Sequence, residues 1–206
     1  MNRGSISRAA VFVLCLLPFS YILYGALAGT LGPDPAEALM HQTGEWSARM
    51  LLLSLLVSPV RKWKPWRLVL KLRRMLGLYA FFYGVIHLVS FAHFYLGWSS
   101  IILFEELVER PYITVGFGAL LLMLPLVLSS TKAIQRRMGK NWLRLHRLVY
   151  LSCALICAHI FWQIRSDAAE AFIYILLFAA LLAWRSKRYL DKRKRAAAAG
   201  SLASAH

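Results

Sequence analysis

Long apolar runs, separated by short polar segments, are the feature that most constrains this chain. Six runs, at residues 9–29, 46–60, 75–96, 112–130, 143–163 and 169–184, are about 15 to 22 residues long, which suits a helix that crosses roughly 30 Å of hydrocarbon. Only helices and closed barrels satisfy their backbone hydrogen bonds in lipid. The runs therefore predict an all-α membrane protein, a six-transmembrane helix bundle.

The charged residues between the runs predict the orientation of this bundle. Of the 25 Lys and Arg residues, 22 fall in the N-terminal arm and in segments 61–74, 132–147 and 185–195, whereas eight of the nine acidic residues fall in the three other connections. By the positive-inside rule, both termini are cytoplasmic and three acidic loops face the far side. The net charge of +16 is then a topology signal. Membrane lipid is an expected partner and nucleic acid is not.

The chain is predicted to form one domain. Residues 1–188 make up the six-helix transmembrane domain, and residues 189–206 are expected to be a disordered, basic cytoplasmic tail. The first apolar run is too long for the core of a signal peptide and is followed by no convincing cleavage site, so it is predicted to be a retained span. No internal repeat is evident in the sequence.

Histidines are the residues on which chemistry would rest. The sequence has no Ser/His/Asp triad, HExxH, phosphate-binding loop or GxGxxG motif, and no carboxylate lies within a predicted span apart from Glu170 at the start of the sixth, so no catalytic residue is predicted. His87 lies in the third run, and His146 and His159 lie in the fifth. An ionisable side chain at membrane depth is costly and indicates a functional site, although a neutral ring bonded to a neighbouring helix is the alternative.

The spacing of these histidines favours haem over a simple metal site. His146 and His159 are separated by a helical rise of about 20 Å, so they do not bind one ion. Haems held by imidazoles from two facing helices fit such spacing, whereas zinc or copper needs ligands that converge on one point. Counted from the cytoplasmic ends of their helices, His87 lies at about 18 Å, His159 at about 25 Å and His146 at about 6 Å. We therefore predict that His87 and His159 share one haem and that His146 serves a separate, cytoplasm-proximal site.

Other candidate residues have simpler interpretations. His93 lies about 120° around the helix from His87 and is predicted to be interfacial, and His41 is predicted to be a solvated residue of the first outer loop. Cys153 and Cys157 are predicted to be small packing residues. None of these four is assigned a cofactor.

Several motifs together resemble the MsrQ (YedZ) family, within the ferric-reductase-like transmembrane superfamily. They are "GPDP" and "HQTG" before the second run, "RRMLGLYAFFYGVIHL" in the third, "RPYITVG" opening the fourth, "STKAIQRRMGKNWLRLHRLVYL" leading into the fifth, and "AHIFW" at its end. The resemblance extends over nearly the whole chain, to about residue 188. The family's haem-ligand positions correspond to His87, His146 and His159, each within its own motif, as axial ligands of the haem iron.

The resemblance implies a membrane b-type cytochrome subunit of the bacterial inner membrane. Its cofactors would be one or two haems b, with FMN as a further cofactor. It would take electrons from the quinone pool or from a cytoplasmic flavin reductase and pass them to a periplasmic MsrP-like molybdopterin subunit. That partner would form a heterodimer with this chain and would itself reduce methionine sulfoxide in oxidised periplasmic proteins.

Two other functions compete with this one. A small transporter or proton-conducting protein would use the same histidines as a proton relay, and its preparation would be colourless. A self-contained oxidoreductase would need a flavin and nicotinamide domain after the sixth run, where only 22 residues follow Trp184. The length of the chain therefore disfavours the second alternative.

Overall fold

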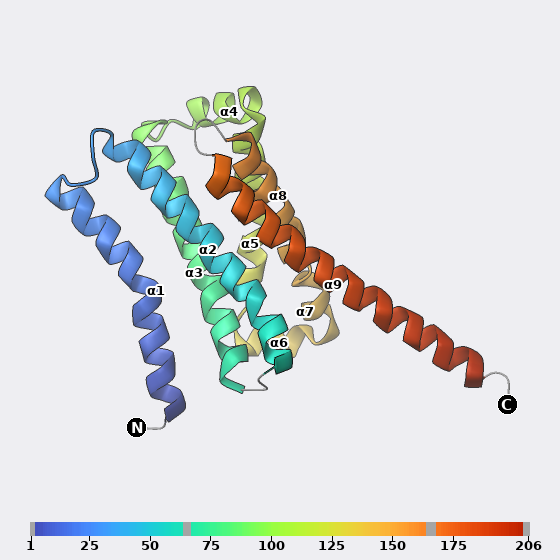
Figure 1. Cartoon of the computed structure of the whole chain (residues 1–206). Helices are drawn as coiled ribbons and strands as arrows, with labels where there is room; N and C mark the ends of the chain where they lie inside the picture. The colour runs from blue at the N-terminus through green and yellow to red at the C-terminus, as the bar shows by residue number, and fades with distance from the viewer. Residues whose placement is uncertain (1–2, 64–66, 164–167, 204–206) are drawn as a thin grey trace.

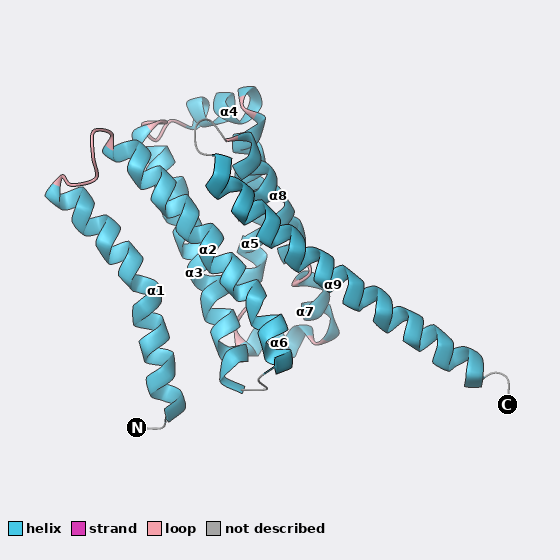
Figure 2. Ribbon diagram, viewed as in Figure 1, coloured by secondary structure: helices cyan, strands magenta, loops and turns pink. Residues whose placement is uncertain are grey.

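The computed structural model describes residues 3–63, 67–163 and 168–203, and every regular element in these ranges is a helix (Figures 1 and 2). The helices are α1 (Arg3–Ala28), α2 (Pro35–Trp63), α3 (Arg67–Phe94), α4 (Ser100–Glu109), α5 (Pro111–Leu128), α6 (Lys132–Met138), α7 (Lys140–Leu145), α8 (Leu148–Trp162) and α9 (Ala168–Ala203). The predicted all-α class is confirmed for these residues.

Two antiparallel helix pairs form the centre of the bundle. Helix α2 packs along α3, α5 packs along α8, and contacts between α3 and α5 join the pairs. Helix α1 leans on α2 and α3 from one side, and α9 crosses α8 and α2 on another (Figure 1). We call the end of the bundle with Asp34, Glu37 and α4 the acidic end, and the end with α6 and α7 the basic end.

Four helical segments are long and apolar enough to cross a membrane. They are Ala9–Ala28, Leu72–Phe94, Pro111–Leu128 and Lys140–Trp162. Helices α2 and α9 are not among them, because each combines a short apolar stretch with charged turns. The chain is thus a membrane protein with several apolar helices, while the count of six spans and the cytoplasmic placement of both termini stay predictions.

The structure differs from the expected elements in three places. Helices α4 and α6 lie in segments predicted to be loops, and Ser99 and Thr131 cap them by accepting hydrogen bonds from the backbone N–H groups of Ile102 and Ile134. The fifth apolar run is divided between α7 and α8, because i→i+3 hydrogen bonds tighten the chain around Arg147. Helix α9 continues through Ala203 where a disordered tail was expected. Ala, Lys and Arg are strong helix formers, which accounts for this extension.

The side chains divide between a small core and an extensive apolar surface. Leu51, Leu55, Tyr83 and Phe178 are buried where α2, α3 and α9 meet, and buried Cys153 joins them from α8. Large apolar side chains on α1 and α9 are exposed instead, as Leu27 is at 81%. Apolar surface of this extent is the expected lipid-facing side of a membrane bundle.

Helix α1 is fastened to α3 by a hydroxyl group beside its internal proline, Pro18. The Tyr83 hydroxyl accepts a hydrogen bond of 3.0 Å from the backbone N–H of Phe19 and donates one of 2.8 Å to the carbonyl of Cys15. In an uninterrupted helix these two backbone groups pair with each other. The hydroxyl is therefore inserted into the backbone hydrogen bond between Phe19 and Cys15. Side chains inserted in this way accompany kinks in helices.

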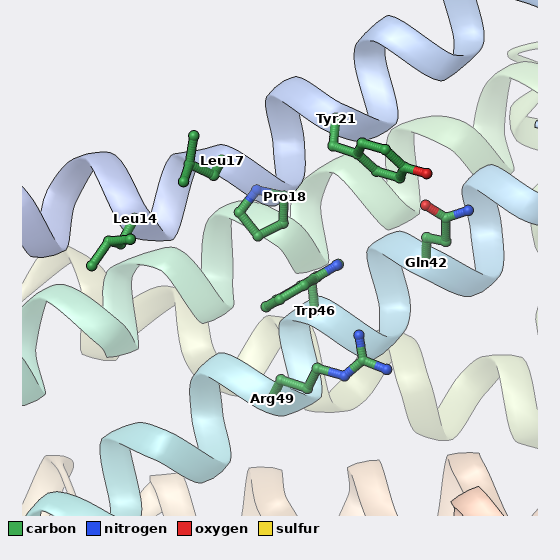
Figure 3. A pocket seen from close by; sticks show the side chains of 7 residues that line it. All are labelled: Leu14, Leu17, Pro18, Tyr21, Gln42, Trp46 and Arg49. Atoms are coloured by element: carbon green, nitrogen blue, oxygen red, sulfur yellow. The ribbon is translucent and has the colours of Figure 1, made fainter. Parts of the chain in front are cut away.

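A cleft of about 520 Å³ separates α1 from α2 on one side of this anchor (Figure 3). Tyr21 and Pro18 of α1 face Trp46 and Gln42 of α2 across it, and Arg49 lies at its edge. Helix α1 is thus held to α3 at Tyr83 and is separated from α2 at this cleft.

Candidate functional site

His87 and His159 lie side by side between the two helix pairs. Their ring centroids are 6.3 Å apart, and the ring planes are inclined by 82°. His87 projects from α3 and His159 from α8, so each pair contributes one imidazole. Both rings are half-buried among the spanning helices. The sequence positions of the two histidines predicted this proximity.

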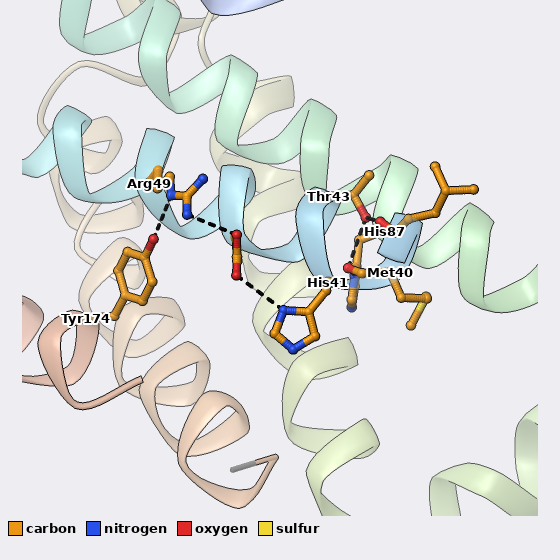
Figure 4. Close-up of polar contacts among 8 residues, drawn as sticks. Met40, His41, Thr43, Arg49, His87 and Tyr174 are labelled. Atoms are coloured by element: carbon orange, nitrogen blue, oxygen red, sulfur yellow. Dashed lines mark hydrogen bonds and ion pairs between the residues drawn. The ribbon is translucent and has the colours of Figure 1, made fainter. Parts of the chain in front are cut away.

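A backbone carbonyl fixes the orientation of each ring. His87 Nδ1 lies 2.9 Å from the carbonyl oxygen of Met40 (Figure 4), and His159 Nδ1 lies 2.7 Å from that of Tyr112. A carbonyl oxygen only accepts hydrogen bonds, so the neutral ring carries its proton on Nδ1 and keeps the lone pair on Nε2. This is the usual arrangement around metal-ligating histidines, whose second nitrogen donates to an acceptor.

A glycine adjoins each of these rings. A Cβ atom on Gly116 would lie 2.7 Å from Nδ1 and 2.8 Å from Cε1 of His159, and one on Gly44 would lie 3.1 Å and 3.2 Å from the same atoms of His87. Each glycine follows, by about one helical turn, the residue whose carbonyl accepts the hydrogen bond, Tyr112 or Met40. The imidazoles therefore lie closer to α5 and α2 than a side chain at these positions would permit.

The two helix pairs repeat one arrangement. Both carbonyl-to-imidazole hydrogen bonds join residues 47 positions apart. Adding 72 to the residue numbers of the first unit gives those of the second, so that Met40, Gly44 and His87 correspond to Tyr112, Gly116 and His159. These contacts therefore form a structural repeat that is not evident in the sequence.

A second pair of contacts follows the same relation. The Ser47 hydroxyl donates to the carbonyl of Ala80 at 2.8 Å, and the Ser152 hydroxyl donates to the carbonyl of Ala119 at 3.0 Å. Both bonds join residues 33 positions apart, and the numbers again differ by 72. The serine lies on the first helix of one pair and on the second helix of the other. The repeat thus preserves the close approach of the two helix backbones, while the serine and the alanine exchange positions between the helices.

The separation of the two imidazoles fits one iron between them. A metal-bound imidazole nitrogen lies about 2.0–2.1 Å from the metal and about 1.2 Å from its own ring centre, so two rings that held one iron between them would have centroids roughly 6.4 to 6.6 Å apart. The observed 6.3 Å is close to this range. The described residues contain no cluster of three or more His, Cys, Asp or Glu side chains that would hold a metal ion by themselves.

His146 is not brought to this site. It caps the C-terminus of α7 at the basic end, where its ring stacks on Trp142 with a centroid distance of 3.8 Å. Its Nδ1 lies 3.2 Å from the Trp142 carbonyl oxygen, and the guanidinium of Arg73 is close enough to interact with it electrostatically. His146 therefore has an aromatic and cationic environment of its own.

The other two histidines among the described residues lie away from this site. His93, at the end of α3, accepts a hydrogen bond of 3.3 Å from Trp98 Nε1. His41 is exposed as predicted, but it lies within α2, where its Nδ1 is 3.2 Å from a Glu45 carboxylate oxygen (Figure 4). Both are residues of the acidic end.

A polar network on α2 was missed by the sequence reasoning. Arg49 contacts the Glu45 carboxylate at 2.9 Å and donates through Nε to the Tyr174 hydroxyl at 2.6 Å (Figure 4). The four-residue spacing of Glu45 and Arg49 along a helix is the signal that predicts such a pair. The pairing neutralises a charge in the apolar part of α2 and links this helix to α9.

Comparison with known proteins gives a consistent result. The family described as "Ferric reductase like transmembrane component" matches residues 43–157. Curated relatives that carry the name "Protein-methionine-sulfoxide reductase heme-binding subunit MsrQ" match most of the chain. One from Xanthomonas axonopodis pv. citri is 40% identical over 195 residues, covering 93% of this chain and 88% of the relative. One from Polaromonas naphthalenivorans is 38% identical over 192 residues, covering 92% and 88%.

Proposed function

Since the chain belongs to the MsrQ family of ferric-reductase-like transmembrane proteins, we propose that it is the haem-binding, electron-transferring membrane subunit of a protein-methionine-sulfoxide reductase system. The observation that supports this most directly is the pair of imidazoles from α3 and α8, each with Nδ1 engaged by a carbonyl oxygen.

In this proposal His87 and His159 would together hold one b-type haem through their Nε2 atoms. A bound haem supplies a carrier for one electron, with a potential set by its ligands and surroundings. The carbonyls of Met40 and Tyr112 keep Nε2 of each ring free of its proton, and the two helix pairs hold the rings at a separation that suits one iron. The chain thereby determines ligand basicity and orientation.

We assign His146 to a separate site at the basic end. Trp142 stacks on its ring and Arg73 lies nearby, so the group bound there would meet an aromatic face and a positive charge. A second haem or an FMN, as implied by the resemblance, are the two candidates. Electrons would enter at this end, from quinone or from a cytoplasmic flavin reductase, if the basic end faces the cytoplasm.

The partner is proposed to dock on the acidic end. The segments predicted to form the docking surface are residues 30–45, residues 97–111 and the connection 165–168, of which residues 165–167 lie outside the described part of the chain. His87 and His159 would then lie on the side of the bundle that faces a periplasmic MsrP-like molybdopterin subunit. Reduction of methionine sulfoxide itself is assigned to that partner.

A visible spectrum of the purified membrane protein, with acid extraction of haem and flavin, tests this function. We expect a red preparation whose low-spin haem signal is lost in both His87→Ala and His159→Ala and is retained in His146→Ala. A colourless but folded protein from cells supplied with haem would favour the transporter alternative. Loss of one common haem in His87→Ala and His146→Ala, with His159→Ala unaffected, would contradict the pairing.

A further inference from the structure

We propose that Gly44 and Gly116 are positioning residues for the two haem-ligating imidazoles. The inference rests on the proposed haem role of His87 and His159. Each ring lies between two fixed parts of one neighbouring helix: a carbonyl oxygen that accepts its Nδ1 proton, and a glycine Cα one turn further along. Backbone atoms of the neighbouring helix thereby hold one side of each ring.

The contact at Gly116 is the tighter of the two. An added Cβ would lie 2.7 Å from Nδ1, 2.8 Å from Cε1 and 3.1 Å from Cγ of His159. These atoms form one side of a rigid ring that is already tied to the Tyr112 carbonyl at 2.7 Å. The imidazole is not the free end of a flexible chain, so a methyl group at Gly116 displaces the ring or lengthens this hydrogen bond.

The contact at Gly44 is similar but less tight. Here the added Cβ would lie 3.1 Å from Nδ1 and 3.2 Å from Cε1 of His87, and a shift of a few tenths of an ångström would relieve it. The hydrogen bond from His87 to Met40 is also longer, at 2.9 Å. The two positions therefore predict effects of different size, with Gly116 the more sensitive.

The internal repeat indicates that these glycines serve the imidazoles rather than general helix packing. Carbonyl, glycine and histidine recur together with the same spacing in both helix pairs, although neighbouring side chains such as Ser47 and Ala119 differ. Not every glycine of the bundle contacts an imidazole: a Cβ on Gly84 of α3 would lie instead 2.9 Å from Leu120, and Gly118 and Gly77 have ordinary room. A Cβ on Gly118 would lie 3.8 Å from Leu155, and one on Gly77 would lie 3.6 Å from Ser54.

Alanine substitutions in the haem-loaded protein test the proposal. The variants are Gly116→Ala and Gly44→Ala, with Gly118→Ala as the matched control on α5 and Gly77→Ala as the control on α3. The measurements are haem per chain, the low-spin electron paramagnetic resonance signal, and the reduction potential. We expect Gly116→Ala to lose or strongly alter the low-spin signal, Gly44→Ala to alter it less, and both controls to match the parent protein.

A second measurement keeps the proposal testable if Gly116→Ala folds poorly. The crowding is between the new methyl group and the His159 ring, so it should vanish when that ring is removed. We expect the haem-free Gly116→Ala, His159→Ala double variant to be as stable in detergent as His159→Ala alone. A double variant that is destabilised as much as Gly116→Ala would show that the glycine serves packing only, and would overturn the proposal.

Two failures are distinguishable in this design. If the parent protein has no low-spin haem that depends on His87 and His159, the proposed function fails. If that haem is present but Gly116→Ala and Gly118→Ala have identical signals and potentials, only the positioning role is refuted.

Discussion

The Tyr83 hydroxyl should be a main fastening of α1 to the rest of the bundle. Tyr83→Phe removes one oxygen that both accepts from Phe19 N–H and donates to the Cys15 carbonyl, and it leaves the buried ring in place. A net hydrogen bond contributes about 0.5–1.5 kcal/mol, so losing two costs about 1–3 kcal/mol. Values near the lower limit are expected in a membrane bundle, where such bonds average about 0.6 kcal/mol each.

Thermal unfolding of the detergent-purified protein measures this cost against two matched variants. Tyr79→Phe removes a single hydrogen bond, donated to the Phe12 carbonyl at 2.9 Å, and should cost about half as much. Tyr24→Phe alters a side chain that is 68% exposed and should leave the unfolding midpoint unchanged. Equal midpoints for Tyr83→Phe and Tyr24→Phe would refute the idea that this bridge holds α1.

Two further predictions concern α2 and the acidic end. Tyr174→Phe removes the acceptor of the 2.6 Å hydrogen bond from Arg49 Nε. Because the donor is charged, we expect the free energy of unfolding to fall by about 1.5–3 kcal/mol in the same assay. An unchanged midpoint would show that this link between α2 and α9 does not contribute to stability. A Ser99→Cys variant should react with an impermeant maleimide only from the periplasmic side of intact cells or spheroplasts. The buried Cys15 and Cys153 should contribute no background, and labelling of Ser99→Cys from the cytoplasmic side alone would reverse the predicted topology.

The apolar runs predicted the central helices well because hydropathy and length are local properties of the sequence. The predicted spans 75–96 and 112–130 end within two residues of α3 and α5 (Arg67–Phe94 and Pro111–Leu128). The runs did not show where helices continue beyond the apolar stretch, as α2 and α9 do, because charged residues end a predicted span without ending a helix. The amphipathic α4 was missed for the same reason.

Helical rise predicted the proximity of His87 and His159 but left an apparent mismatch of about 7 Å in their heights. In the structure α3 begins at Arg67 and α8 at Leu148. The two helices therefore do not begin at one level, and counting along each helix from a predicted span end does not give the relative heights of the rings. The glycine contacts and the carbonyl partners were not predictable, because they depend on how closely two helices approach.

The repeat could not be recognised in the sequence, for a physical reason. The two helix pairs share a close approach of the two backbones within each pair and a close approach of one backbone to an imidazole. A serine hydroxyl bonds across each pair, but it comes from the first helix in one pair and from the second helix in the other. Side chains that face different neighbours or lipid are free to differ. Among the residues that form these contacts, only the glycine and the histidine keep their identity in both units.

The repeat leads to a prediction for the number of bis-histidine haems. Subtracting 72 from His159 gives His87, but subtracting it from His146 gives Arg74, and none of the six histidines lies between residues 42 and 86. The duplicated unit therefore supplies two imidazoles toward the acidic end and a single one at the basic end. We expect one bis-histidine, low-spin haem per chain, measured as the haem-to-protein ratio of that signal, with any group at His146 having a different ligand set. Two equivalent low-spin bis-histidine haems per chain would contradict this reasoning, because α3 carries its two histidines, His87 and His93, toward the acidic end and none near the basic end.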